Sequence, residues 1–357
     1  MTSRTTEAPS LAPYDAILLV SFGGPEKPDE VVDFLEVVTA GSGIPRSRLA
    51  TVGEHYFLFG GKSPINDQNK ALMAALEQEL VTRGVQLPIY WGNRNWHPFI
   101  AEAVQQLKAD GHRRVLMLTT SAFPSYAGCR SYREALAPAL AEHGDDLRVE
   151  RIGNYGLDEG FVQANAEALR TALTELPGAR VVFVTHSIPT DMDANSGVDG
   201  EGTGGRGAYT RWHRELAERV FAEQGIDGEH DLVFCSRSGR PGQPWLEPDV
   251  NDHLEALHAQ GIDRVVLAPI GFISDHMEVI YDLDTQARET CDKLGIQMVR
   301  AATAGVSPAF VATLADRLLD RAAQARETAD GDLPCDLGCG GAGCCPNLGA
   351  PNTPAID

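Results

Sequence analysis

Two side chains stand out for the chemistry that they could share: His186 in the sequence THSIP and Glu278 in the sequence SDHMEV. Each follows a short apolar run of the kind that forms a buried strand. A neutral imidazole can accept a proton near pH 7 or bind a borderline metal, and a carboxylate can take a second proton or hand over a metal ion. Alone, His186 could equally be a hydrogen-bonded core residue and Glu278 part of a solvated helix face. The two residues indicate a shared site only if the fold brings them together.

The elements that must position them are strands and helices in alternation. Apolar runs without polar alternation are typical of strands buried on both faces, and crossover helices between them indicate parallel sheets. The predicted strands begin at Ala16, Pro88, Arg114, Arg148, Arg180, Asp231, Arg264 and Ile296. We therefore predict an α/β protein with two Rossmann-like halves, each a doubly wound four-stranded parallel sheet.

The same pattern predicts the domain organisation. An N-terminal domain should cover 14–174 and a C-terminal domain 175–306, with a helix over 307–327 that packs back on the N-terminal domain. The stretch 191–206 is rich in Gly and Asp and predicts a loop without a regular element. The tail 328–357 is rich in Gly, Pro and Cys, so it would need a covalent or metal clamp to become ordered.

The place of a binding site follows from the sheet topology. In open α/β sheets, ligands bind beyond the carboxyl ends of the strands, where the strand order reverses. For a flavodoxin-like order this point lies between the first and third strands of each half. His186 follows the first predicted strand of the second half, and Glu278 follows the third. Phe22 and Tyr126 stand in the corresponding places of the first half.

Four sequence blocks resemble those of ferrochelatases and occur in the family's order. They are GGKSPIN (60–66), THSIP (185–189), PWLEPDV (244–250) and PIGFISDHMEVIYDLD (269–284). The resemblance implies two chelatase-type domains with a porphyrin cleft between them, and a lyase that inserts Fe(II) into a porphyrin in haem biosynthesis. It implies that His186 and Glu278 are the catalytic pair that also contacts the iron. It further implies that Ser63 and Tyr126 line the porphyrin.

The identity of the porphyrin is a finer expectation. Coproporphyrin III, with four propionates, is favoured because the stretch 43–61 carries charged residues where membrane-docking relatives present an apolar lip. Arg46, Arg48 and Arg94 are candidate propionate partners, since a guanidinium matches carboxylate geometry, although each could be an ordinary surface arginine. Some relatives carry a tyrosine that approaches the iron axially; Phe22 takes that place in the cleft and cannot ligate. Protoporphyrin IX, a cobalt-type tetrapyrrole chelatase and a non-catalytic haem or iron sensor remain as alternatives.

The cysteines predict a second metal centre. Some ferrochelatases bind a [2Fe–2S] cluster through one mid-chain cysteine and three in a C-terminal extension. The resemblance therefore implies Cys129, Cys335, Cys339 and Cys344 as thiolate ligands, with Cys345 as a substitute. Two alternatives to the cluster remain: a structural zinc site with the same cysteine ligands, and a reduced tail that binds no metal.

The overall charge narrows the classes of partner. The chain carries a net charge of -20, which argues against nucleic acid and anionic lipid as partners. No apolar run approaches the roughly 18 residues of a membrane-spanning helix, and the first residues lack an apolar signal core. We expect a cytoplasmic protein without stable membrane insertion, whose partners are the porphyrin and enzymes of the haem pathway.

Overall fold

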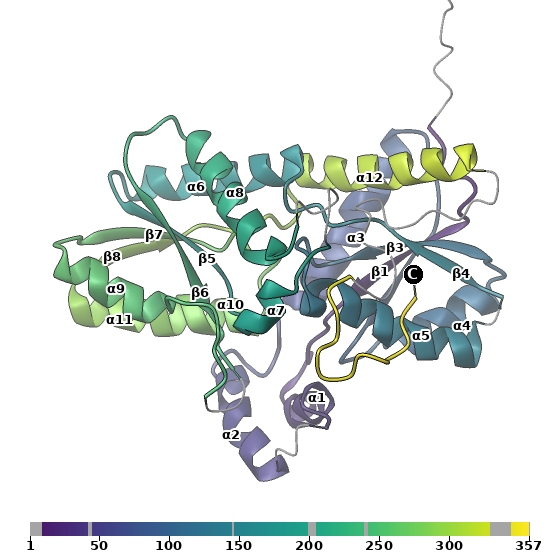
Figure 1. Cartoon of the computed structure of the whole chain (residues 1–357), viewed down its shortest axis with the longest axis horizontal. Helices are drawn as coiled ribbons and strands as arrows, with labels where there is room; N and C mark the ends of the chain where they lie inside the picture. The colour runs from purple at the N-terminus through teal and green to yellow at the C-terminus, as the bar shows by residue number, and fades with distance from the viewer. Residues whose placement is uncertain are drawn as a thin grey trace, which may run out of the picture.

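Two four-stranded parallel sheets form the centre of the molecule (Figure 1). The computed structural model describes residues 9–41, 45–144, 146–198, 205–238, 242–328 and 344–356. Within these ranges, the first sheet contains β1 (Ala16–Ser21), β2 (Ile89–Asn93), β3 (Arg114–Thr119) and β4 (Arg148–Arg151). The second contains β5 (Arg180–His186), β6 (His230–Cys235), β7 (Arg264–Ala268) and β8 (Gln297–Arg300). Their orders are β2-β1-β3-β4 and β6-β5-β7-β8, so the predicted fold class and strand order are confirmed.

Helices cover both faces of each sheet, as parallel crossovers require. The helices that flank the first sheet are α3 (Ile65–Thr82), α4 (Ile100–Ala109) and α5 (Ser131–His143), whereas α6 (Glu159–Glu175) packs on β7 and β8 of the second sheet. Those that follow β5 are α7 (Thr190–Ala194), α8 (Ala208–Ala222), α9 (Val250–Ala259), α10 (Met277–Tyr281), α11 (Arg288–Leu294) and α12 (Pro308–Glu327). Two π-helical segments, η2 (Tyr126–Arg130) and η3 (Asp282–Ala287), lead into α5 and α11. In the described part of the chain, no helix is long and apolar enough to span a membrane.

The last helix joins the two halves. α12 runs along one side of the molecule and packs against both α3 and α6 (Figure 1). It buries Phe310, Leu314 and Leu318 in a hydrophobic core that also contains residues of both sheets. Gly160 permits this close packing, because a Cβ at this position would lie 2.1 Å from the backbone oxygen of Ala309.

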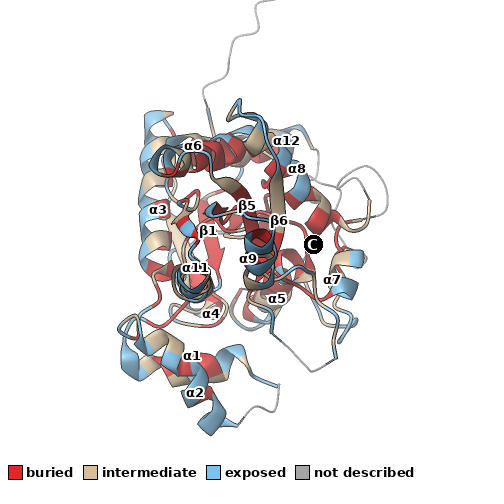
Figure 2. Ribbon diagram, turned by 90° about the vertical axis from the view of Figure 1, so that its left-hand side faces the viewer, coloured by how far each residue is buried: buried red, intermediate tan, exposed pale blue. Residues whose placement is uncertain are grey.

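A helical arm extends from the first half below the sheets. It consists of η1 (Pro28–Glu30), α1 (Val31–Val38) and α2 (Arg46–Phe57), and most of its outer surface is exposed (Figures 1 and 2). The sequence pattern did not indicate α2, because only Leu49 and Gly53 of that helix are buried and no apolar stripe marks it. The expectation that 191–206 lacks a regular element was wrong at its start, where α7 occupies Thr190–Ala194.

The final described segment, 344–356, lies along α5 (Figure 1). A guanidinium nitrogen of Arg130 donates a hydrogen bond to the carbonyl of Thr353 at 3.3 Å. The backbone N–H of Ile356 donates to the carbonyl of Arg133, and its side chain packs against the core beside β1 and β3. The end of the chain is therefore held on the first half by both polar and apolar contacts.

Candidate active site

A cavity of about 790 Å³ opens at the carboxyl ends of β1, β3, β5 and β7. This volume lies within the range of about 300–1,000 Å³ that is usual for small-molecule sites. Most of the wall is apolar, and Phe22, Phe34 and Met192 belong to it. Polar groups converge at the end formed by β5 and α10. The cavity thus occupies the place where the strand order of each sheet reverses.

His186 and Glu278 face each other in this cavity. His186 is the last residue of β5, and Glu278 lies in the first turn of α10. The Nε2 atom of His186 lies 3.3 Å from the Oε2 atom of Glu278. The Nδ1–H of His186 donates to the backbone carbonyl of Ser187, which leaves Nε2 as the atom that exchanges protons with the cavity. The structure therefore brings together the two residues that the sequence singled out.

The electrostatics of the pair favour a proton on the histidine. Burial lowers the pKa of His186, but the charge and hydrogen bond of Glu278 outweigh it and raise the pKa above its usual value. For Glu278, burial raises the pKa, whereas the charge of His186, its hydrogen bond and the charge of His276 lower it to about 2. Glu278 faces the open cavity, so 54% of its side chain stays accessible although it lies deep in the protein. An approaching cation would meet an ionised carboxylate.

A second carboxylate follows one helical turn later. Burial, opposed by a hydrogen bond from the Ser236 hydroxyl and reinforced by the charge of Glu278, raises the pKa of Asp282 to about 6. Ser236 holds a left-handed backbone conformation with φ 61°, which is uncommon for a residue with a side chain and typical of functional loops. Asp282 therefore changes its charge close to neutral pH.

Arg300, at the end of β8, fixes the segment that carries Glu278. Its guanidinium lies 2.6 Å from a carboxylate oxygen of Asp284 and 3.2 Å from both carboxylate oxygens of Asp275. The backbone N–H of Asp275 also donates to Gln68 of α3 at 2.8 Å. Sequence reasoning missed this role of Arg300.

The other predicted porphyrin contacts divide into two groups. Phe22, Ser63 and Arg94 lie in the cavity wall. Arg46 does not: it is exposed on α2, and its guanidinium pairs with two carboxylates of the arm, one of them Asp33 at 2.7 Å. Tyr126 also lies outside the wall, because its hydroxyl points to Glu134 and to the C-terminal segment.

Two further wall residues could not be singled out from the sequence. Arg237 follows β6 and lies in the cavity wall, with Glu247 as its ion-pair partner at 3.3 Å. His55 of α2 stacks on Tyr281 of α10, with ring centroids 3.9 Å apart, and so connects the arm to the second half across the cavity. Neither residue belongs to a motif, and the spatial contact is the only signal that identifies them.

Three cysteines gather outside the cavity. Cys129, Cys344 and Cys345 are buried, and the thiol of Cys345 is hydrogen-bonded to both of the others. The hydrogen bond with Cys129 and burial raise the pKa of Cys345 to about 12, against the lowering effect of the hydrogen bond with Cys344. The N–H of Gly197 also donates to the sulfur of Cys345 at 3.3 Å. Cys335 and Cys339 lie outside the described residues. Across the ranges that the structure describes, no three His, Cys, Asp or Glu side chains surround a point that could hold a metal ion.

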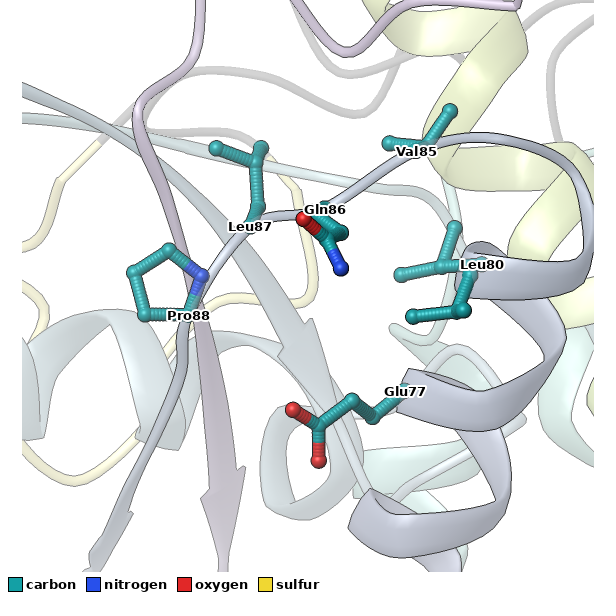
Figure 3. A pocket seen from close by; sticks show the side chains of 7 residues that line it. Glu77, Leu80, Val85, Gln86, Leu87 and Pro88 are labelled. Atoms are coloured by element: carbon teal, nitrogen blue, oxygen red, sulfur yellow. The ribbon is translucent and has the colours of Figure 1, made fainter.

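A smaller hollow of about 250 Å³ lies between the end of α3 and the start of β2 (Figure 3). Its wall is formed mainly by the apolar side chains Leu80, Val85, Leu87 and Pro88. Glu77 is the only titratable residue among those that line it. This hollow lacks the paired groups that proton transfer or metal binding would need, so the chemistry belongs to the larger cavity.

Comparisons with known proteins agree with this geometry. A family model described as Ferrochelatase matches residues 14–322. The chain is 49% identical to a Streptomyces coelicolor protein named coproporphyrin III ferrochelatase, over 94% of each chain. A Streptomyces griseus protein of the same name shows the same identity and coverage. The solved structure described as "SirB from Bacillus subtilis with Fe3+" shares the fold, with a TM-score of 0.53 at 14% identity over 89% of this chain and 99% of that one. The chain belongs to the ferrochelatase family and is a metal chelatase.

Proposed function

We propose that this chain inserts Fe(II) into coproporphyrin III and forms Fe-coproporphyrin III in haem biosynthesis. The observation that carries the proposal is the 3.3 Å contact between His186 and Glu278 in a cavity of porphyrin-compatible volume. The names of the relatives at 49% identity support iron and coproporphyrin III as the substrates. The high coverage on both sides supports a shared activity of the whole chain.

Insertion requires two pyrrole protons to leave and Fe(II) to lose its water. Glu278, with its lowered pKa, offers a carboxylate to the cation. Because the same carboxylate raises the pKa of His186, an iron ion that neutralises Glu278 would release the proton of the imidazole. His186 Nε2 then becomes free to accept a pyrrole proton, and Asp282 lies near enough to influence the charge of both. Iron delivery and proton removal are therefore coupled through one contact.

The apolar wall supplies the remaining requirement. A tetrapyrrole can bury its faces against side chains such as Phe22 and Phe34, and the binding energy of the periphery can offset the strain of a bent ring. Phe22 carries no ligating atom, so the iron would receive no axial ligand from this side. Arg94 and Arg237, which both lie in the wall, are the propionate partners that we propose. Arg46, paired within the arm, would have to break its ion pairs with α1 before it could contribute.

A [2Fe–2S] cluster at the three buried cysteines is the finer part of the proposal. The donor set fits such a cluster in part: Cys129, Cys344 and Cys345 supply adjacent sulfurs, and Gly197 supplies an N–H group to one of them. The fourth ligand would come from Cys335 or Cys339. When bound, the cluster would cross-link the tail to the body of the protein. Absorption and EPR spectra of anaerobically purified protein test this; a colourless sample with stoichiometric zinc would contradict it.

The decisive experiment is an anaerobic metalation assay with coproporphyrin III and protoporphyrin IX. The wild type should turn over repeatedly and favour coproporphyrin III. His186→Ala and Glu278→Gln should lose at least about a hundredfold in rate while still binding porphyrin. His258→Ala, an exposed histidine on α9, is the matched control and should retain full activity. Near-normal rates in both catalytic variants would remove the assignment, and binding without turnover by the wild type would favour a sensor.

A further inference from the structure

A buried hydrogen-bond network lies directly behind His186. The hydroxyl of Tyr209 in α8 donates to the backbone carbonyl of His186 at 2.8 Å and lies 3.1 Å from the hydroxyl of Thr185. That hydroxyl lies 2.9 Å from Nε2 of His213, whose Nδ1 lies 2.7 Å from the carbonyl of Tyr209. Thr185 and His213 are fully buried, and Tyr209 is 7% exposed. None of these groups is needed by the chemistry described above.

The sheet explains why the His186 carbonyl requires such a partner. The pairing of β5 with β7 ends at Phe183, and the carbonyl of Val184 still accepts from the N–H of Gly271 at 3.3 Å. The carbonyl of His186, two residues further, points to the same side, beyond the end of β7. There the sheet offers no donor. The hydroxyl of Tyr209 supplies the hydrogen-bond donor that a neighbouring strand would otherwise provide.

The direction of every hydrogen bond in the network is fixed. Burial lowers the pKa of His213 to about 3, so its ring is neutral and carries one N–H. The carbonyl of Tyr209 can only accept, which places that hydrogen on Nδ1 and makes Nε2 an acceptor for the hydroxyl of Thr185. The carbonyl of His186 also can only accept, which commits the hydrogen of the Tyr209 hydroxyl. The 3.1 Å approach of the Thr185 and Tyr209 hydroxyls therefore has no hydrogen between them and is a packing contact. The other three hydrogen bonds have a single arrangement of hydrogens.

The network also reaches the first half of the molecule. The ring of His213 stacks on Phe123 in the loop after β3, with centroids 3.6 Å apart and planes at 25°. Phe123 also lines the cavity. On the far side, a Cβ at Gly271 would lie 2.1 Å from the hydroxyl of Thr185, so the network has no room to shift. The strand end that carries His186 is thus fixed relative to both walls of the cavity.

We propose that Tyr209, Thr185 and His213 are positioning residues, which hold the backbone of His186 so that its imidazole stays in line with Glu278. This inference rests on the proposed function. The groups that face the imidazole itself are Glu278, Asp282 and His276, and none of them supports its backbone. Loss of the Tyr209 hydroxyl should therefore impair the insertion step rather than porphyrin binding.

The test compares two buried tyrosines that make the same kind of bond. Tyr155 is 1% exposed, and its hydroxyl donates to the carbonyl of Thr119 at the end of β3, at 2.8 Å. Tyr209→Phe and Tyr155→Phe each remove one buried hydroxyl from a strand-end carbonyl, so both should lower the melting temperature similarly. Single-turnover insertion of Fe(II) into bound coproporphyrin III measures the chemical step, and porphyrin fluorescence measures binding.

We expect Tyr209→Phe to slow insertion about tenfold, which corresponds to about 1.4 kcal/mol in the barrier, with less than about a twofold change in porphyrin affinity. Tyr155→Phe should keep the wild-type rate. Thr185→Val should slow insertion, and Thr185→Ser should restore it. An unchanged rate in Tyr209→Phe, equal slowing in both tyrosine variants, or a loss confined to affinity would overturn the inference. A wild type that cannot metalate would instead refute the proposed function.

Discussion

Replacement of Asp282 by Asn should stabilise the protein at pH 8 and slow iron insertion. The pKa of this carboxyl rises from 3.8 to about 6 in the folded state, mainly because of burial. Each pH unit of such a difference corresponds to about 1.36 kcal/mol. Above pH 6, where the carboxyl is ionised in both states, the folded protein therefore bears a cost of up to about 3 kcal/mol. The amide of Asn avoids this cost and still accepts a hydrogen bond from the Ser236 hydroxyl.

The size of the expected stabilisation depends on pH, which provides an internal control. Because the folded pKa is raised, the folded state binds more protons between about pH 4 and pH 6, and its stability falls as the pH rises through this window. The cost is roughly 1 kcal/mol at pH 4.5 and reaches its full value above pH 7. Urea unfolding of Asp282→Asn and wild type at pH 4.5 and pH 8 measures the difference.

A second variant separates ionisation from the general loss of a carboxylate. Asp284→Asn removes the partner of Arg300 at 2.6 Å and should destabilise the protein at pH 8. Asp282→Asn should show the opposite sign at the same pH. This prediction would be refuted if Asp282→Asn were no more stable than wild type at pH 8, or if its gain in stability were equal at both pH values. Burial of the ionised Asp282 carboxylate would then not be what lowers the stability of the folded protein.

Three further predictions follow from other parts of the structure. Gly160→Ala should lower the free energy of unfolding by about 1–3 kcal/mol or more, since its new methyl group would collide with the carbonyl of Ala309; an unchanged urea midpoint would contradict the close packing of α6 and α12. Cys345→Ser should remove visible absorption from anaerobically purified protein, whereas Cys291→Ser in the core beside β7 should keep it. Because the pKa of Glu278 is about 2, the pH dependence of the insertion rate should show no midpoint near pH 4.5. A midpoint near pH 4.5 that is present in wild type and absent from Glu278→Gln would refute the ion pair between Glu278 and His186.

The sequence was sufficient for the sheets and for the central pair. Strands such as β1, β3, β5 and β7 contain continuous apolar runs, and sheet topology alone places the residues after β5 and β7 side by side. This explains why His186 and Glu278 could be paired before any coordinates were considered, and the resemblance to ferrochelatases is likewise confirmed.

Other features depend on side-chain directions that no sequence pattern encodes. The role of Arg300 arises from carboxylates 16 and 25 residues earlier in the chain. The resemblance to ferrochelatases implied that Tyr126 lines the cavity, yet the π-helical turn η2 aims its hydroxyl at α5. Arg46 was chosen for its charge, which the neighbouring helix α1 already satisfies. In each case the deciding factor is a competing partner brought near by the fold.

The route of the chain has a consequence for how the molecule can move. The polypeptide passes from the first sheet to the second between β4 and α6, which packs on β7 and β8, and it returns between β8 and α12. Proteins of two lobes that close on a ligand pivot about their connecting strands, but here the returning helix is embedded in a core common to both lobes. Such a rotation of one lobe relative to the other would disrupt the packing of that core. The distance between the two walls of the cavity is thus set during folding. A planar ligand must therefore change its own shape to fit the cavity, because it cannot draw the walls together.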